Sequence, residues 1–128
     1  MSITDSKTAQ TTAEIAVRFS ELARQEKWFE IQDELFADNV RSIEPVTARY
    51  LHNAEGKAAV RKKGEAWVQQ IEAVHKTSTT EPVVGGNHFA VGREVDITVR
   101  GLGRIQLNEV IVYKVENGRI VLEQFFYE

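Results

Sequence analysis

"EVIVYKVENGRIVLEQFFYE", residues 109–128, is the stretch of the sequence that decides the fold. Two runs of β-branched and aromatic residues flank Asn117-Gly118, the strongest short signal for a β-hairpin with a two-residue type I′ turn. Such a turn pairs Glu116 with Arg119. The stretch therefore predicts two antiparallel strands that end the chain and whose register is fixed by the turn.

This register predicts which side chains share a face of the hairpin. Side chains alternate with period two along a strand, so counting outward from the turn assigns each residue to a face. The face expected to point inward carries the pairs Val115–Ile120, Tyr113–Leu122, Ile111–Gln124 and Glu109–Phe126. The face expected to point outward carries Val110, Val112, Lys114, Val121, Glu123, Phe125 and Tyr127.

The outward face of the hairpin is also largely apolar. Three predicted helices suffice to cover only one side of a sheet, and a monomer rarely exposes a large apolar patch. A second copy of the chain is the simplest cover for such a patch. We therefore expect a homodimer formed through the outer sheet face that carries Val110, Val112, Val121, Phe125 and Tyr127.

The rest of the chain divides into a helical first half and a β-rich second half. Thr11 and Glu14 form the capping-box pattern T-x-x-E, and apolar residues at helical spacing predict helices over about 12–23, 28–36 and 57–71. "VRSIEPV" at 40–46 predicts a short strand, and "RKK" at 61–63 is expected to face solvent. Strand patterns separated by glycine turns follow from residue 75. Helices first and strands later indicate the α+β class.

Composition limits the class of function. The 128 residues suit one domain over 11–128, preceded by a polar and flexible tail over 1–10. The absence of cysteine excludes disulfides and thiolate zinc sites, and a net charge of −3 with scattered basic residues disfavours nucleic acid. No apolar run is long enough for a membrane helix, and no secretory signal is recognisable. We therefore expect a cytoplasmic protein. We also expect no cofactor, because "GLGR" at 101–104 lacks the third glycine of a dinucleotide motif.

Several polar residues are predicted to point into the interior. Glu109 and Gln124 lie on the inner face of the hairpin, and Glu44 points inward if Val40 and Ser42 do. A buried carboxylate must be paired, or its pKa rises. Glu44 and Glu109 are therefore either structural carboxylates or acid–base groups. The three histidines, His52, His75 and His88, lack the spacing of a metal site, so no metal is expected.

Three segments resemble the SnoaL-like branch of the nuclear transport factor 2-like superfamily. They are "LFADNVRSIEP" (35–45), "GKAAVRKKGEAW" (56–67) and "NEVIVYKVENGRIVLEQFFY" (108–127), and the likeness extends from about Thr11 to Tyr127. The resemblance implies a cystatin-like α+β cone, in which three N-terminal helices pack in the concave face of a curved, mainly antiparallel sheet and leave a pocket. Members of this fold include ketosteroid isomerases, polyketide cyclases, dehydratases and many domains without a known activity.

The resemblance also implies positions for a site. Glu44 and Glu109 are candidate catalytic residues, because they match positions that face the pocket in such proteins. His75 is the third candidate, as an acid–base partner of Glu44 or Glu109, because histidine titrates in the useful range. The aspartate of SnoaL-type cyclases near the end of the last strand has no clear counterpart, since Gln124 or Phe126 falls at that level. The expected pocket-lining residues are Trp28, Trp67, Phe89, Asp96, Ile111, Tyr113, Gln124 and Phe126.

Three functions remain open at this point. The first is a small dimeric pocket protein that binds a hydrophobic or carbonyl-containing molecule. The second is a cofactor-free isomerase, cyclase or dehydratase that uses a pocket carboxylate as general base. The third is a non-catalytic assembly scaffold whose cone is filled. Fold alone does not choose among them.

Overall fold

The computed structural model describes residues 10–128, and it has the predicted α+β class. Three helices, α1 (Thr12–Ala23), α2 (Trp28–Leu35) and α3 (Lys57–Gln70), accompany one sheet. The strands are β1 (Phe36–Ile43), β2 (Ala54–Glu55), β3 (Ile71–Thr79), β4 (Val83–Gly85), β5 (His88–Val99), β6 (Gly103–Glu116) and β7 (Arg119–Phe126). The predicted tail over 1–10 lies, apart from Gln10, outside the described residues.

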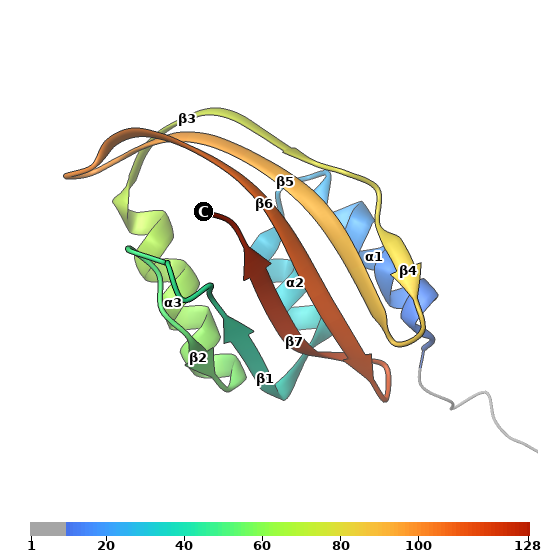
Figure 1. The fold of residues 1–128 in the computed structure, drawn as a ribbon. Coiled ribbons are helices and arrows are strands. Elements are labelled where there is room, and N and C mark those ends of the chain that lie inside the picture. Colours follow the sequence, from blue (N-terminus) through green and yellow to red (C-terminus); the bar gives the residue numbers. More distant parts are fainter. Residues whose placement is uncertain (1–9) are drawn as a thin grey trace, which may run out of the picture.

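The sheet follows the strand order β2-β1-β7-β6-β5-β3, and β4 pairs with β5. Only the β1–β7 pair is parallel among the described strands, so the sheet is mixed. In Figure 1 the long strands β5 and β6 arch across the molecule, with α1 and α2 behind them and α3 beside β1 and β2. Strand β1 begins at Phe36, four residues earlier than the predicted strand, because the backbone is already extended there.

The capping box that was predicted for the first helix is present. The Thr11 side chain accepts a hydrogen bond from the Glu14 amide at 3.1 Å, and the Glu14 carboxylate accepts one from the Thr11 amide at 2.8 Å. These two bonds satisfy backbone donors that a helix start otherwise leaves unpaired. They fix the first turn of α1, whose buried face then begins with Ile15 and Ala16.

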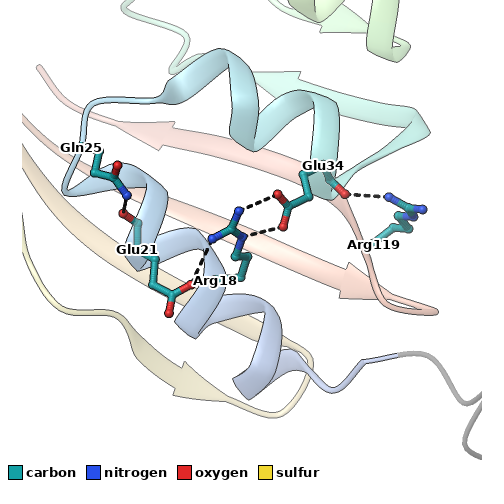
Figure 2. A network of polar contacts seen from close by, with 5 residues as sticks. All are labelled: Arg18, Glu21, Gln25, Glu34 and Arg119. Carbon is teal, nitrogen blue, oxygen red and sulfur yellow. Dashed lines mark hydrogen bonds and ion pairs between the residues drawn. The ribbon is translucent and has the colours of Figure 1, made fainter.

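A surface network joins α1, α2 and the final hairpin (Figure 2). Arg18 donates from Nε and Nη2 to the two carboxylate oxygens of Glu34 at 2.6 and 2.9 Å, and from Nη1 to Glu21 at 3.2 Å. Arg119, at the start of β7, donates to the Glu34 carbonyl at 2.7 Å. These groups are exposed, so the network adds little stability. The bidentate Arg18–Glu34 contact orients α1 against α2.

The hairpin turn is as predicted, but the register beyond it is not. Asn117 and Gly118 both have positive φ, 51° and 73°, as a type I′ turn requires. The pairs Glu116–Arg119 and Val115–Ile120 are confirmed. Lys114 then pairs with Leu122, so Val121 is one extra residue and forms a β-bulge.

The bulge reverses the facing of every later residue of β7. Tyr113 pairs with Glu123, Ile111 with Phe125 and Val110 with Phe126, so the predicted pairs Tyr113–Leu122, Ile111–Gln124 and Glu109–Phe126 are wrong. Glu123 and Phe125 now share the inner face with Tyr113 and Ile111. Gln124 and Phe126 share the outer face with Val110 and Val112. The cause is physical: the side-chain period is two, so a shift of one residue exchanges the faces.

An aromatic cluster closes one end of the interior. The Phe19 ring of α1 lies 5.2 Å from the ring centroid of Phe89 and 4.7 Å from that of Tyr113, and Trp28 packs edge-on against it at 5.7 Å. Phe19, Phe89 and Tyr113 are almost completely buried. Such tilted and edge-on pairs are favourable arrangements for aromatic rings. The other end of the inner face is not filled in this way, and the cavity described below lies there.

None of the helices within residues 10–128 is both long enough and apolar enough to cross a membrane.

Candidate functional site

A cavity of about 620 Å³ lies between the helices and the inner face of the sheet. Helices α2 and α3 and strands β3, β5, β6 and β7 contribute to its walls, which are mostly aliphatic and aromatic. The apolar and aromatic walls include Trp28, Ile31, Trp67, Val95, Ile97, Leu107, Ile111, Tyr113 and Phe125. A volume in this range and apolar walls with a few polar groups are typical of small-molecule sites.

A buried ion pair anchors the polar side of the cavity. Lys63 of α3 donates to Glu44, the residue after β1, at 2.6 Å, and their side chains are only 7% and 2% exposed. Lys63 also donates to the Ser42 hydroxyl at 2.9 Å, and Ser42 donates to Glu123 at 2.8 Å. The Tyr127 hydroxyl donates to the second Glu44 oxygen at 2.5 Å. The Glu44 carboxylate is therefore fully satisfied, as a buried charge has to be.

The burial of Lys63 corrects the prediction that the whole "RKK" segment faces solvent. Lys63 lies three residues after Val60 and four before Trp67, and this spacing places all three on one helix face. Lys62 is exposed, and Arg61 is half-buried and pairs with Asp33 at 2.8 Å. The sequence placed Lys63 with the solvated residues on account of its charge, although its spacing from Val60 and Trp67 fits the buried face.

Two of the other carboxyl groups that line the cavity belong to the sheet, Glu109 of β6 and Glu123 of β7. Burial raises the pKa of Glu109 to about 7; the positive charge of Arg93 opposes the shift, and the charges of Glu44 and Glu123 add to it. Burial likewise raises the pKa of Glu123 to about 7, against a hydrogen bond from Ser42 and the charge of Lys63. Both groups therefore change protonation near neutral pH, which is the range that suits proton transfer.

A second cation, Arg93 of β5, lies at the rim of the cavity. Its guanidinium donates to Glu26 at 3.0 Å and to Thr79 at 3.0 Å, and it lies 4.4 Å from the Trp28 ring centroid. Trp28 donates its indole N–H to the same Glu26 carboxylate at 2.9 Å. Burial tends to raise the pKa of Glu26, but the bonds from Arg93 and Trp28 outweigh it and lower that pKa. Arg93 is therefore paired with Glu26 and lies over the Trp28 ring.

The structure brings six of the predicted site residues to the cavity: Glu44, Glu109, Trp28, Trp67, Ile111 and Tyr113. Their roles stay predictions. The other five lie elsewhere. Phe89 is buried in the aromatic cluster, and the β-bulge turns Gln124 and Phe126 to the outer face.

His75 and Asp96 point away from the cavity. Strand β3 has a register shift between Val74 and Lys76, and His75 is exposed with its Nε2 2.7 Å from the Thr98 hydroxyl. Thr98 and Asp96 alternate with Ile97 and Val95, which line the cavity. Asp96 pairs with Arg104 at 2.8 Å, and this hydrogen-bonded pair lowers the pKa of Asp96 to about 2. His75 is therefore not placed to act on a molecule in the cavity.

Sequence reasoning missed Glu123, Lys63, Tyr127 and Arg93 as cavity or network residues. Glu123 and Tyr127 were assigned outward by the unbulged register, and no residue pattern near Val121 signals the bulge. Arg93 alternates with Val91 and Val95 along β5, and a period-two count of "HFAVGREVDITV" could have found it. Across the described residues, no group of three or more histidine or acidic side chains is arranged to hold a metal ion.

The profile described as the SnoaL-like domain matches residues 10–127. This chain belongs to the SnoaL-like family. A crystal structure of a candidate SnoaL-like polyketide cyclase from Mesorhizobium loti is 35% identical, with a TM-score of 0.86 over 92% of this chain and 100% of that chain. The search of curated proteins found no match.

Two more distant structures share the fold of this SnoaL-like domain. A protein of unknown function with a cystatin-like fold from Xanthomonas campestris has a TM-score of 0.75 at 15% identity, over 92% of this chain and 91% of that chain. A candidate isomerase from Bacillus subtilis has a TM-score of 0.69 at 19% identity, over 93% and 90%. At these identities the likeness establishes the fold alone.

Proposed function

We propose that this SnoaL-like domain binds a small, mainly apolar molecule in the 620 Å³ cavity. The observation that carries this proposal is the cavity itself, whose walls are apolar and aromatic while its few polar groups converge from β1, α3, β6 and β7. A filled scaffold would need no such space, because protein interiors are close-packed.

Cavity filling tests this proposal. Leu107 lines the cavity, whereas Leu102 is exposed in the β5–β6 turn. Leu107→Trp should abolish the thermal stabilisation that apolar compounds give, and Leu102→Trp should preserve it. The screen measures melting temperature with and without each compound, since a ligand that binds only the native state raises stability. If no apolar compound stabilises the wild type, or if both variants respond alike, the cavity is not a binding site. The assembly-scaffold function would then be favoured.

A second candidate function is proton transfer on a carbonyl compound. It is favoured by Glu109, which lines the apolar cavity and whose pKa is about 7. A carboxylate of that pKa can remove a proton beside a carbonyl, and the Tyr113 hydroxyl or a protonated Glu123 can donate to the developing oxyanion. In this assignment Glu109 is the base, and His75 and Gln124 take no part because they lie outside the cavity.

Hydrogen–deuterium exchange tests the proton-transfer function. With 2-tetralone as probe in D₂O, NMR should show faster loss of the α-proton signal in the presence of the protein. Glu109→Gln should remove the acceleration, and Glu72→Gln, which changes an exposed carboxylate outside the cavity, should not. Acceleration that persists in Glu109→Gln would reject Glu109 as the base.

We also propose that two copies associate through the outer sheet face. Val110 and Phe126 are 46% and 49% exposed there, beside the half-buried Val112 and Leu122. An apolar patch over neighbouring strands is typical of a protein interface. The bulge changes the residues of this interface: Phe126 replaces Phe125, and Tyr127 is bonded to Glu44 on the inner side.

A further inference from the structure

The walls of the cavity carry more negative than positive groups. Five glutamates line it (Glu26, Glu30, Glu44, Glu109 and Glu123), and two cations, Lys63 and Arg93, accompany them. A cavity with more carboxyl groups than cations disfavours an anionic ligand, because like charges repel strongly in apolar surroundings. The charge of the walls therefore carries information about the ligand that cavity shape alone does not.

Both cations are already committed to two of the glutamates. Lys63 lies 2.6 Å from Glu44, and Arg93 lies 3.0 Å from Glu26. Their positive charges also face aromatic rings, Lys63 over Phe125 at 5.3 Å and Arg93 over Trp28 at 4.4 Å. Neither cation is thus available to a ligand carboxylate unless an existing pair is broken, and breaking the buried Lys63–Glu44 pair leaves an uncompensated buried charge.

These pairs leave three carboxyl groups of the cavity without a cation: Glu30, which is exposed, Glu123 and Glu109. Arg93 faces it across the β5–β6 register but turns its guanidinium to Glu26 and Thr79. Within residues 10–128, no side chain forms an ion pair or a hydrogen bond with Glu109. Glu123, by contrast, accepts a bond from Ser42. Glu109 is therefore an acceptor that lines the cavity and receives no donor from a side chain of the described residues.

The surroundings of Glu109 suit an organic cation. Trp67 lines the same cavity, and among the described residues no cation covers its ring, in contrast to the rings of Trp28 and Phe125. Tyr113 also lines the cavity, but its ring is stacked on Phe89. Aromatic faces attract ammonium groups, and more so where water is excluded. Apolar walls from Val95, Ile97 and Leu107 provide the surface for a hydrocarbon body.

We propose that the ligand of this cavity is a protonated amine on an apolar body, with its ammonium group paired to Glu109. This inference rests on the proposed binding function and names the class of molecule that the site selects. The ammonium group supplies the donor that Glu109 lacks, and Glu123 adds a second negative group to the same cavity. The ligand then supplies the positive partner that Glu109 does not receive from Lys63 or Arg93.

The pairing makes binding depend on pH. Burial raises the pKa of Glu109 to about 7, so about half of the free protein carries a proton there at neutral pH. The titratable groups around it are Arg93 from β5, Glu123 from β7, Lys63 from α3, Glu44 after β1 and Tyr113 from β6 itself. A cation binds the ionised carboxylate, so the proton must leave on binding. Affinity should therefore fall by about tenfold from pH 8 to pH 6 if one proton is released.

A matched series of three probes tests the proposal: 4-phenylbutylamine, 4-phenylbutanol and 4-phenylbutanoate, which share one body and differ in charge. Isothermal titration calorimetry of the whole chain at pH 8 should give at least about tenfold tighter binding for the amine than for the alcohol. The butanoate should bind more weakly than the alcohol. Titrations in two buffers of different ionisation enthalpy should reveal release of a proton with the amine at pH 7 and none with the alcohol.

Variants separate Glu109 from other carboxyl groups. Glu109→Gln should reduce amine affinity at pH 8 to that of the alcohol and leave the alcohol unchanged, whereas Glu72→Gln should change neither. Equal binding of amine and alcohol, or tightest binding of the butanoate, would overturn the inference and leave the binding function intact. Failure of all three probes to bind the wild type would overturn both. If Glu109→Gln does not fold, the probe series and the pH series of the wild type still test whether an ionised cavity carboxylate pairs with the amine, and equal affinities at pH 6 and pH 8 would overturn the inference.

Discussion

Phe125 and Phe126 are adjacent in the chain, yet they belong to opposite faces of the sheet. Phe125 lines the cavity and lies 5.3 Å from the Lys63 ammonium group. Phe126 is 49% exposed on the outer face, opposite Val110. Without the bulge at Val121 their places would be exchanged, and Gln124 instead of Glu123 would enter the cavity. A single inserted residue therefore decides the charge of the site.

The inner face itself contains two kinds of carboxyl group. Glu44 is paired with Lys63 and accepts a bond from Tyr127, whereas Glu109 has no partner among the described residues. Partners stabilise the ionised form of a carboxyl, and burial without partners stabilises the neutral form. Under the proposed function, Glu44 is a structural carboxylate and Glu109 is the group that meets the ligand.

The largest expected effect on stability comes from breaking the Lys63–Glu44 ion pair. Lys63→Met removes the positive charge that Glu44 needs and leaves a buried carboxylate unpaired, which costs about 3–5 kcal/mol of unfolding free energy. Denaturant unfolding monitored by tryptophan fluorescence measures it. Lys62→Met is the matched control, because Lys62 is exposed on the same helix and should change stability by less than about 0.5 kcal/mol. Equal losses in the two variants would contradict the role of the pair.

A smaller change in stability, of opposite sign, is expected when Glu109 is replaced. The pKa of Glu109 is about 7 in the folded protein against an ordinary value of 4.5, so the native state binds the proton more tightly. Its contribution favours folding below pH 4.5 and is lost as pH rises from 4.5 through 7. Relative to wild type, Glu109→Gln should gain stability across this window, by up to about 3 kcal/mol at pH 8.

Unfolding curves of wild type and Glu109→Gln at pH 5, 6, 7 and 8 measure this gain. Glu72→Gln serves as the control and should follow the wild type at each pH, since Glu72 is exposed. A constant difference between Glu109→Gln and wild type across the range would mean that Glu109 titrates like an exposed glutamate. Glu44 and Glu109 would then not differ in the way proposed.

The sequence predicted the parts of this site that depend on local rules. The capping box of Thr11 and Glu14, the Asn117-Gly118 turn and the helical face of Val60 and Trp67 follow from residue type and spacing. The family was also identifiable, because the segments that resemble it span the chain. Glu44 and Glu109 were found because a carboxylate on an otherwise apolar face is conspicuous.

The sequence could not predict what depends on tertiary pairing. The bulge at Val121 and the register shift near His75 are set by how β7 and β3 pair with their neighbours, and neither carries a glycine or another marker. Strict alternation therefore misplaced Gln124 and Phe126, and the register shift in β3 was not foreseen for His75. Lys63 was misplaced for another reason: its charge favours solvent, and only the tertiary contact with Glu44 compensates its burial.

The turn that sets the register offers a smaller perturbation. Gly118 has φ of 73°, a conformation that a β-branched residue resists, so Gly118→Val should cost roughly 1–3 kcal/mol of unfolding free energy. Asn117→Gly, which permits the positive φ at the neighbouring position, should change stability far less. Denaturant unfolding compares the two. A Gly118→Val variant as stable as wild type would mean that the type I′ turn does not fix the pairing of β6 with β7.

The smallest effect on stability, and the sharpest test of the two faces, comes from Phe126. Phe126→Glu adds a charge to a half-exposed outer position, so the unfolding free energy of the monomer should change by less than about 0.5 kcal/mol. Association should respond strongly, because a charge in an apolar interface has to be desolvated. Sedimentation equilibrium should show a dimer for wild type and a monomer for Phe126→Glu. Val83→Glu places the same charge on β4, at a residue 75% exposed, and should remain dimeric. A wild type that is monomeric at high concentration, or a Val83→Glu that dissociates equally, would show that the outer face does not bind a second copy.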